Sequence, residues 1–179
     1  YIKEPNGKKI LDFKKNLLSV VYHSLPIKKW IKKKDLLKRI HFDEKLPNAT
    51  PYVTSYYKKS WGFCLPKNKI RKLNKKKYYI CIDSEFKKGF LEIGEFFKKG
   101  KKKEEIFFST YICHPAMAND NLSSVAVQIF LINYLKRIYP KSNFSYRFVF
   151  LPETIGSISY LSKKISLLKK NMMMGFALS

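Results

Sequence analysis

The sequence has little of three things: long apolar runs, paired cysteines and arginine. Its apolar stretches are short and interrupted by Lys or Asn, so the run of roughly 20 apolar residues that a transmembrane helix needs is absent. We therefore expect no membrane span. The three cysteines are an odd number in dissimilar contexts, which argues against a secreted disulfide scaffold. Because no secretory signal sequence opens the chain either, we expect a cytoplasmic protein.

The scarcity of arginine weakens the inference of nucleic-acid binding that the large positive charge would otherwise support. The 179 residues carry a formal net charge of +24, which would attract nucleic acid, anionic membranes or acidic substrates. Only four of the 37 basic residues are arginine, the residue that base-edge and phosphate recognition favour. The pattern favours a solvated, lysine-rich surface and predicts no specific nucleic-acid partner. Sequence-independent binding, with a steep salt dependence, remains the alternative.

The first part of the chain has the pattern of short strands and turns. The expected strands cover residues 17–22, 51–57, 61–64, 78–82 and 90–93. Lys87-Lys88-Gly89 predicts a hairpin turn between the last two strands, and residues 33–40 predict a helix.

After Lys103 the pattern becomes β-α-β-α, which is typical of a layer built on parallel strands. Strands are expected at 106–112 and 146–151, parallel to each other because crossovers are right-handed. Residues 121–138 predict a mostly buried helix with Leu122, Val125, Ala126, Ile129 and Phe130 on its main apolar face. A second helix at 157–169 would turn Ile158, Leu161, Ile165 and Leu168 inward.

Chemically capable residues follow each of these strands. Cys113-His114-Pro115 and Asp120 come after the first strand, and Glu153 comes after the second. Ligands bind beyond the carboxyl ends of strands in an open α/β sheet, so His114, Asp120 and Glu153 should converge. Imidazole and carboxylate suit zinc, and a further carboxylate could act as general base toward a water. The pattern fits a metallohydrolase best.

Each of these residues also has a purely structural interpretation. Asp120 could cap the following helix, His114 could be a hydrogen-bonded loop histidine, and Glu153 could stabilise a helix N-terminus. A Cys113–His114 nucleophilic pair is disfavoured, because neighbouring residues at a strand end point in different directions. The aromatic residues at 55–57 and 61–64 could stack a sugar or a base, although an aromatic core is the preferred interpretation.

The same residues resemble a known family. Residues 110–115, 118–123, 146–148 and 152–157 are similar to bacterial aminopeptidase-like proteins of surface-polysaccharide biosynthesis loci, which resemble the co-catalytic di-zinc aminopeptidases. Residues 51–57 and 61–64 resemble the inserted domain of unknown function of the same proteins. The resemblance covers nearly the whole chain and implies an α/β, zinc-exopeptidase-like core with an inserted strand-rich α+β domain.

The resemblance also implies roles and boundaries. His114 and Asp120 would be metal ligands, with Asp120 bridging, and Glu153 would be the catalytic general base for attack of a metal-bound hydroxide on an amide carbonyl. The cofactor would be one or two zinc ions, and the substrate a small peptide-like or aminoacyl compound. Residues 1–20 would lead into the core, residues 21–98 would form the inserted domain, and residues 99–179 would form the first half of the core.

Three positions depart from the family pattern. The aminopeptidases have an Asp where Ala116 stands and a second, metal-binding glutamate where Thr154 stands, and Ser124 replaces a usual glycine. The chain starts at Tyr1 and ends in apolar residues, so we expect it to be a fragment. The remaining metal ligands would lie beyond Ser179, so we expect this fragment to be inactive alone. The alternative function is a non-catalytic binding module with a decayed metal site. Substrate identity and oligomeric state are not readable from this sequence.

Overall fold

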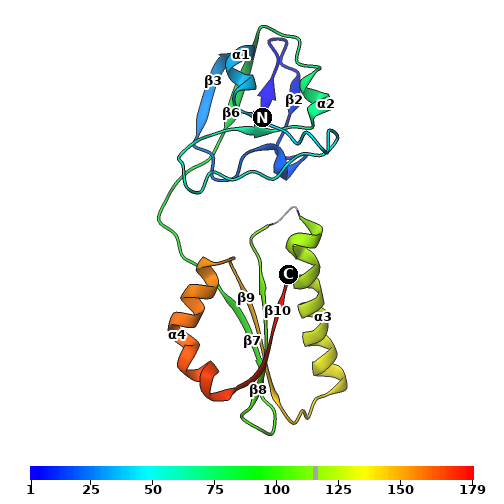
Figure 1. Ribbon diagram of the computed structural model, residues 1–179, viewed down its shortest axis with the longest axis vertical. Coiled ribbons are helices and arrows are strands. Elements are labelled where there is room, and N and C mark those ends of the chain that lie inside the picture. Colours follow the sequence, from blue (N-terminus) through cyan, green and yellow to red (C-terminus); the bar gives the residue numbers. More distant parts are fainter. Residues whose placement is uncertain (115–116) are drawn as a thin grey trace. The chain divides into compact units, whose positions relative to one another are not determined.

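The computed structural model describes residues 1–114 and 117–179, and it consists of two compact units, Tyr1–Lys88 and Gly89–Ser179. Each unit has its own four-stranded sheet, so the chain has a mixed α/β structure (Figure 1). Across the described residues, we find no helix with the length and hydropathy needed to span a bilayer. The division into segments 1–20, 21–98 and 99–179 remains a prediction.

The first unit is built on an antiparallel sheet of order β2-β1-β6-β3. Alternation along β6 turns Tyr78, Ile80 and Ile82 into the core, where they join Ile2 and Phe63. Its elements, in chain order, are β1 (Ile2–Lys3), β2 (Lys9–Leu11), the 3-10 turn η1 (Leu17–Ser19), β3 (Ile27–Lys32), α1 (Lys33–Leu37), β4 (Ile40–His41), β5 (Phe63–Cys64), α2 (Lys67–Ile70) and β6 (Lys77–Ile82). The expected strand at 78–82 and the helix near residues 33–40 are confirmed.

Two strands expected in this unit are wrong. Residues 17–19 form a 3-10 turn, because the side chain of Asn16 accepts a hydrogen bond from the amide of Leu18 and so replaces strand pairing. Within the described residues, segment 51–57 contributes only Thr54, in an isolated bridge to Tyr22.

The second unit has a sheet of order β10-β8-β9-β7, with β10, β8 and β9 parallel and β7 antiparallel to β9. The helices α3 and α4 flank this sheet on either side (Figure 1). The elements are β7 (Gly94–Lys98), β8 (Glu105–Tyr111), the kinked turn η2 (Ala118–Leu122), α3 (Ser123–Ile138), β9 (Ser145–Leu151), α4 (Ile155–Asn171) and β10 (Met172–Leu178). The two expected parallel strands and both helices are confirmed.

The expected hairpin at Lys87-Lys88-Gly89 and the strand at 90–93 are wrong. The strands on either side of this segment, β6 and β7, belong to different sheets, and β7 begins at Gly94. Its partner is β9, about 50 residues further along the chain. A local turn signal could not reveal such a non-local pairing.

The expected burial of the two helices is also largely wrong. In α3 the buried residues are Ser124 and Gln128, whereas Ile129 and Phe130 are 50% and 67% exposed. In α4, Leu168 is buried as expected, but Ile158 is 64% exposed. Helical periodicity identifies an apolar stripe, and only the tertiary structure determines which side of the helix meets the sheet.

Candidate metal site at the ends of two parallel strands

The pairing of β8 with β9 determines the position of the candidate site. Tyr111 and Leu151, the last residues of the two strands, are partners in the register, and the amide of Ile112 donates to the carbonyl of Leu151 at 2.8 Å. His114 and Glu153 therefore follow the two strands at the same edge of the sheet, where α/β proteins bind ligands.

His114 and Glu153 meet directly. The Nε2 atom of His114 lies 3.1 Å from the Oε2 atom of Glu153. The imidazole is buried, with 8% of the residue exposed, whereas the carboxylate side chain is 54% exposed. This pair thus combines a sheltered nitrogen ligand with a carboxylate that solvent or a substrate can reach.

Cys113 is a third member of the same group. Its Sγ atom accepts a hydrogen bond from the backbone amide of Glu153 at 3.4 Å. The potential ligand atoms of Cys113, His114 and Glu153 all lie within 4.8 Å of one another. Burial raises the pKa of the Cys113 thiol, and the nearby carboxylates of Glu153 and Asp120 raise it further, although the hydrogen bond from the Glu153 amide acts in the opposite direction.

Asp120 lies in a different arrangement. It belongs to η2, is exposed, and its carboxylate accepts a hydrogen bond from the hydroxyl of Tyr111. That bond, together with burial, raises the pKa of Tyr111 to about 12. The Tyr111 ring in turn packs edge-on against the His114 ring at 5.8 Å. Tyr111 therefore connects Asp120 to the other predicted site residues, although Asp120 is outside the group of three.

The predicted cap role of Asp120 has no support, because the N-cap residue of the following helix α3 is Leu122 and this helix has no side-chain cap hydrogen bond. Its neighbour Asn121 is buried instead and anchors the turn to β8. The Asn121 side-chain amide donates to Thr110 Oγ1 at 2.6 Å and to the Tyr111 carbonyl at 2.8 Å. These two bonds hold the end of η2, just before α3 begins, beside the end of β8.

Thr154 makes the sharp turn between β9 and α4. Its φ of 58° and ψ of −70° are rare for a β-branched residue. The amide of Ile155 donates back to the carbonyl of Glu153 at 2.6 Å, so Thr154 is the centre of a γ-turn. This strained backbone turns the chain immediately after Glu153 and places that residue at the entry to α4.

The donor set suits zinc. Imidazole nitrogen, thiolate sulfur and carboxylate oxygen are all common zinc ligands. Reasoning from the sequence found His114 and Glu153 but considered Cys113 only as a nucleophile, which it disfavoured. The position of Cys113 next to His114 was the signal that could have marked it as a possible ligand. The departure noted at Ala116 falls outside the described residues.

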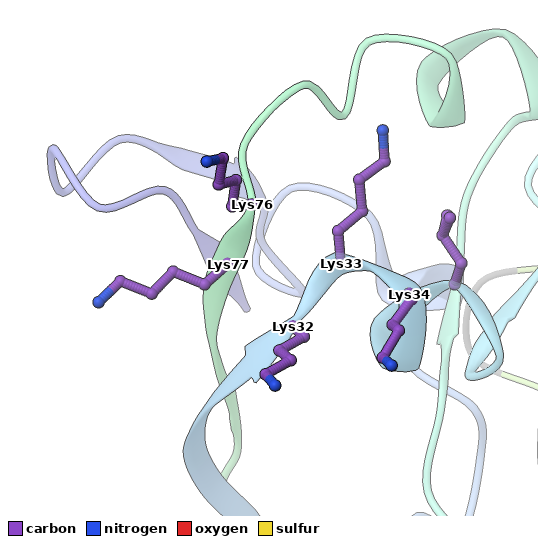
Figure 2. Close-up of a pocket in the computed structure, with 6 residues that line it drawn as sticks. Lys32, Lys33, Lys34, Lys76 and Lys77 are labelled. Atoms are coloured by element: carbon purple, nitrogen blue, oxygen red, sulfur yellow. The ribbon is translucent and has the colours of Figure 1, made fainter.

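A second chemically distinctive surface lies on the first unit. This unit has 24 basic and seven acidic residues, so it carries +17 of the chain's +24. An open hollow of about 720 Å³ is lined by Leu37 and five lysines, Lys32, Lys33, Lys34, Lys76 and Lys77. Figure 2 shows the lysine side chains projecting in different directions. Over the parts of the chain that the structure describes, none of the five forms an ion pair with a carboxylate.

Comparisons with known proteins agree over almost the whole chain. The family described as "Domain of unknown function (DUF4910)" matches residues 3–179. A Clostridium acetobutylicum protein named "Putative polysaccharide biosynthesis protein with aminopeptidase-like domain" is 43% identical over 175 residues, which are 98% of this chain and 40% of that protein. The crystal structure of a "putative peptidase" from Clostridium acetobutylicum superposes with a TM-score of 0.94 at 42% identity, covering 99% of this chain and 41% of that one.

These similarities confirm the resemblance to aminopeptidase-like proteins linked to polysaccharide biosynthesis. The chain spans about two fifths of the length of each of these relatives.

Proposed function

We propose that this chain, which belongs to the DUF4910 family, forms part of a zinc-dependent, aminopeptidase-like hydrolase of amide or peptide bonds. The observation that carries the proposal is the group formed by Cys113, His114 and Glu153 at the carboxyl ends of two parallel strands. Similarity to proteins named as a peptidase and as aminopeptidase-like supports the reaction class. The name of one relative also supports a role in polysaccharide biosynthesis.

In this proposal His114 and Asp120 hold the zinc. The buried His114 imidazole offers a nitrogen ligand, and Asp120 offers a carboxylate held by the Tyr111 hydroxyl. Zinc bound there would act as a Lewis acid toward a carbonyl oxygen and lower the pKa of a water molecule. The cofactor would be one or two zinc ions, with further ligands from other parts of the protein.

Glu153 is the proposed general base. Its carboxylate is more than half exposed, so it can reach the attacking water, and the γ-turn at Thr154 holds its backbone. The proton taken from the water would pass to the leaving amine. The substrate class that fits this chemistry is a small peptide-like or aminoacyl amide.

The test starts with the metal content of the full-length protein, purified without chelator and measured by elemental mass spectrometry. We expect one or two zinc ions per chain, and loss of zinc in His114→Ala and Asp120→Ala without unfolding. Glu153→Gln should keep the metal and lose hydrolysis of aminoacyl substrates, whereas the exposed control Glu92→Gln should keep both. Normal turnover in Glu153→Gln would refute the base role.

One observation favours a second candidate, a non-catalytic binding module. Thr154 stands where the related aminopeptidases have a metal-binding glutamate, so the site has one carboxylate fewer. This candidate predicts no stoichiometric zinc binding even after zinc is added back to the full-length protein.

A further inference from the structure

We propose that Cys113, as a thiolate, is a ligand of the metal ion at the proposed site. The inference rests on the proposed function for the presence of a metal, and it goes beyond the His114 and Asp120 ligand set. Its basis is that the Sγ atom of Cys113 lies within 4.8 Å of the ligand atoms of both His114 and Glu153.

The end of β8 explains how two adjacent residues can face one site. Inside a strand, neighbouring side chains point to opposite faces, which would separate a thiol from the next imidazole. Cys113 and His114 lie beyond Tyr111, the last residue of β8, where regular alternation no longer applies. The hydrogen bond from the Glu153 amide then holds the Cys113 sulfur toward the β9–α4 junction.

A sulfur ligand would change which metal the site prefers. His114 with carboxylates alone would suit several divalent ions, including manganese, whereas a thiolate favours zinc. Cys113 would thus supply a third protein ligand from this chain, in addition to His114 and Asp120. The other two cysteines, Cys64 and Cys81, are buried in the core of the first unit.

The competing explanation is that Cys113 only positions Glu153. In that case its sulfur accepts the Glu153 amide hydrogen bond and never contacts a metal. Serine at position 113 could accept the same hydrogen bond, but it would be a poor replacement for a thiolate ligand. Cys113→Ser therefore separates the two roles, and Cys81→Ser is the matched control.

The experiment is cobalt(II) substitution of the full-length, metal-depleted protein, followed by absorption spectroscopy. We expect visible d–d bands from bound cobalt and an intense near-ultraviolet thiolate-to-cobalt band. Cys113→Ser should lose the near-ultraviolet band and keep the d–d bands, while Cys81→Ser should keep both. X-ray absorption of the zinc-loaded, unmutated protein should in addition show a sulfur neighbour at about 2.3 Å.

The outcomes separate this inference from the proposed function. Cobalt d–d bands without a thiolate band, or a thiolate band that survives in Cys113→Ser, would overturn the role of Cys113 and leave the metal site standing. The absence of any cobalt band in the unmutated protein would overturn both. Circular dichroism of each variant verifies that it is folded, and the X-ray absorption measurement requires no variant.

Discussion

The Nε2 atom of His114 lies 3.1 Å from the Oε2 atom of Glu153, although the two residues are 39 positions apart in the chain. The contact exists because β8 and β9 are parallel neighbours whose last residues are register partners. Each residue follows its own strand, so the sheet brings together a nitrogen ligand and a carboxylate that local sequence keeps apart.

Removing the Tyr111 hydroxyl should weaken metal binding. Tyr111→Phe keeps the ring that packs on His114 but removes the donor that holds the Asp120 carboxylate. Loss of such an outer hydrogen bond typically costs about 10–100-fold in metal affinity, and we expect that range here. Zinc affinity of the full-length protein is measured by competition with a chelator, with the exposed Tyr134→Phe as control. Equal affinity in Tyr111→Phe and the unmutated protein would contradict a role for Asp120 at the metal.

The Tyr111–Asp120 bond also predicts a pH dependence. The pKa of Tyr111 is raised from its ordinary value of 10 to about 12, chiefly because its hydroxyl donates to Asp120. A raised pKa means that the neutral phenol is favoured in the folded state. Its stabilising contribution is therefore complete below pH 10 and is lost as the pH rises toward 12.

Tyrosinate absorbance measures this titration. As the pH is raised, the tyrosinate absorbance of the unmutated protein should exceed that of Tyr111→Phe only near pH 12, rather than near pH 10. In Asp120→Asn this titration of Tyr111 should move back toward pH 10, because the carboxylate acceptor is gone. A difference centred at pH 10 in the unmutated protein would show that the bond does not persist in solution.

The ion pair between Glu105 and Arg147 should contribute strongly to the stability of the second unit. The two residues are 2% and 6% exposed, and two hydrogen bonds of 2.6 and 2.9 Å join them. Glu105→Ala leaves the buried guanidinium with fewer partners and should lower the free energy of unfolding by about 3 kcal/mol. Urea denaturation measures the change. The exposed neighbour Glu104→Ala should change stability by no more than about 0.5 kcal/mol, and equal effects of the two variants would refute the prediction.

The lysine-lined hollow predicts a stability that depends on salt. Lys32 and Lys77 are direct partners across β3 and β6, an arrangement in which like charges repel. Lys32→Glu creates an opposite-charge pair and should raise the free energy of unfolding by about 0.2–1 kcal/mol at low salt. The gain should shrink in high salt, because exposed charges are screened. Lys29→Glu makes the same charge change at a position opposite Ile80, so it serves as the control. An equal gain in the free energy of unfolding in Lys29→Glu would show that the lower net charge, and not the Lys32–Lys77 pair, causes the effect.

Much of the second unit follows from the sequence. The strands β8 (105–111) and β9 (145–151) are rich in apolar and aromatic residues and are bounded by polar segments. This local pattern is enough to predict both strands, at 106–112 and 146–151. Right-handed crossover then makes them parallel and places His114 and Glu153 at one edge. The order of the three parallel strands and the antiparallel β7 depends on pairings between distant segments, which no local pattern contains.

What the sequence by itself determined is therefore the type of the main elements of the second unit (β8, α3, β9 and α4), the basic character of the chain and the chemistry available after β8 and β9. These properties are local, because they depend on side-chain type and spacing along a few turns or strand residues. Only the tertiary structure decided that Cys113 joins His114 and Glu153 while Asp120 bonds to Tyr111, and that Ile129 and Phe130 of α3 are exposed. The direction of a side chain beyond a strand end, and the face that a helix buries, depend on packing against residues distant in sequence.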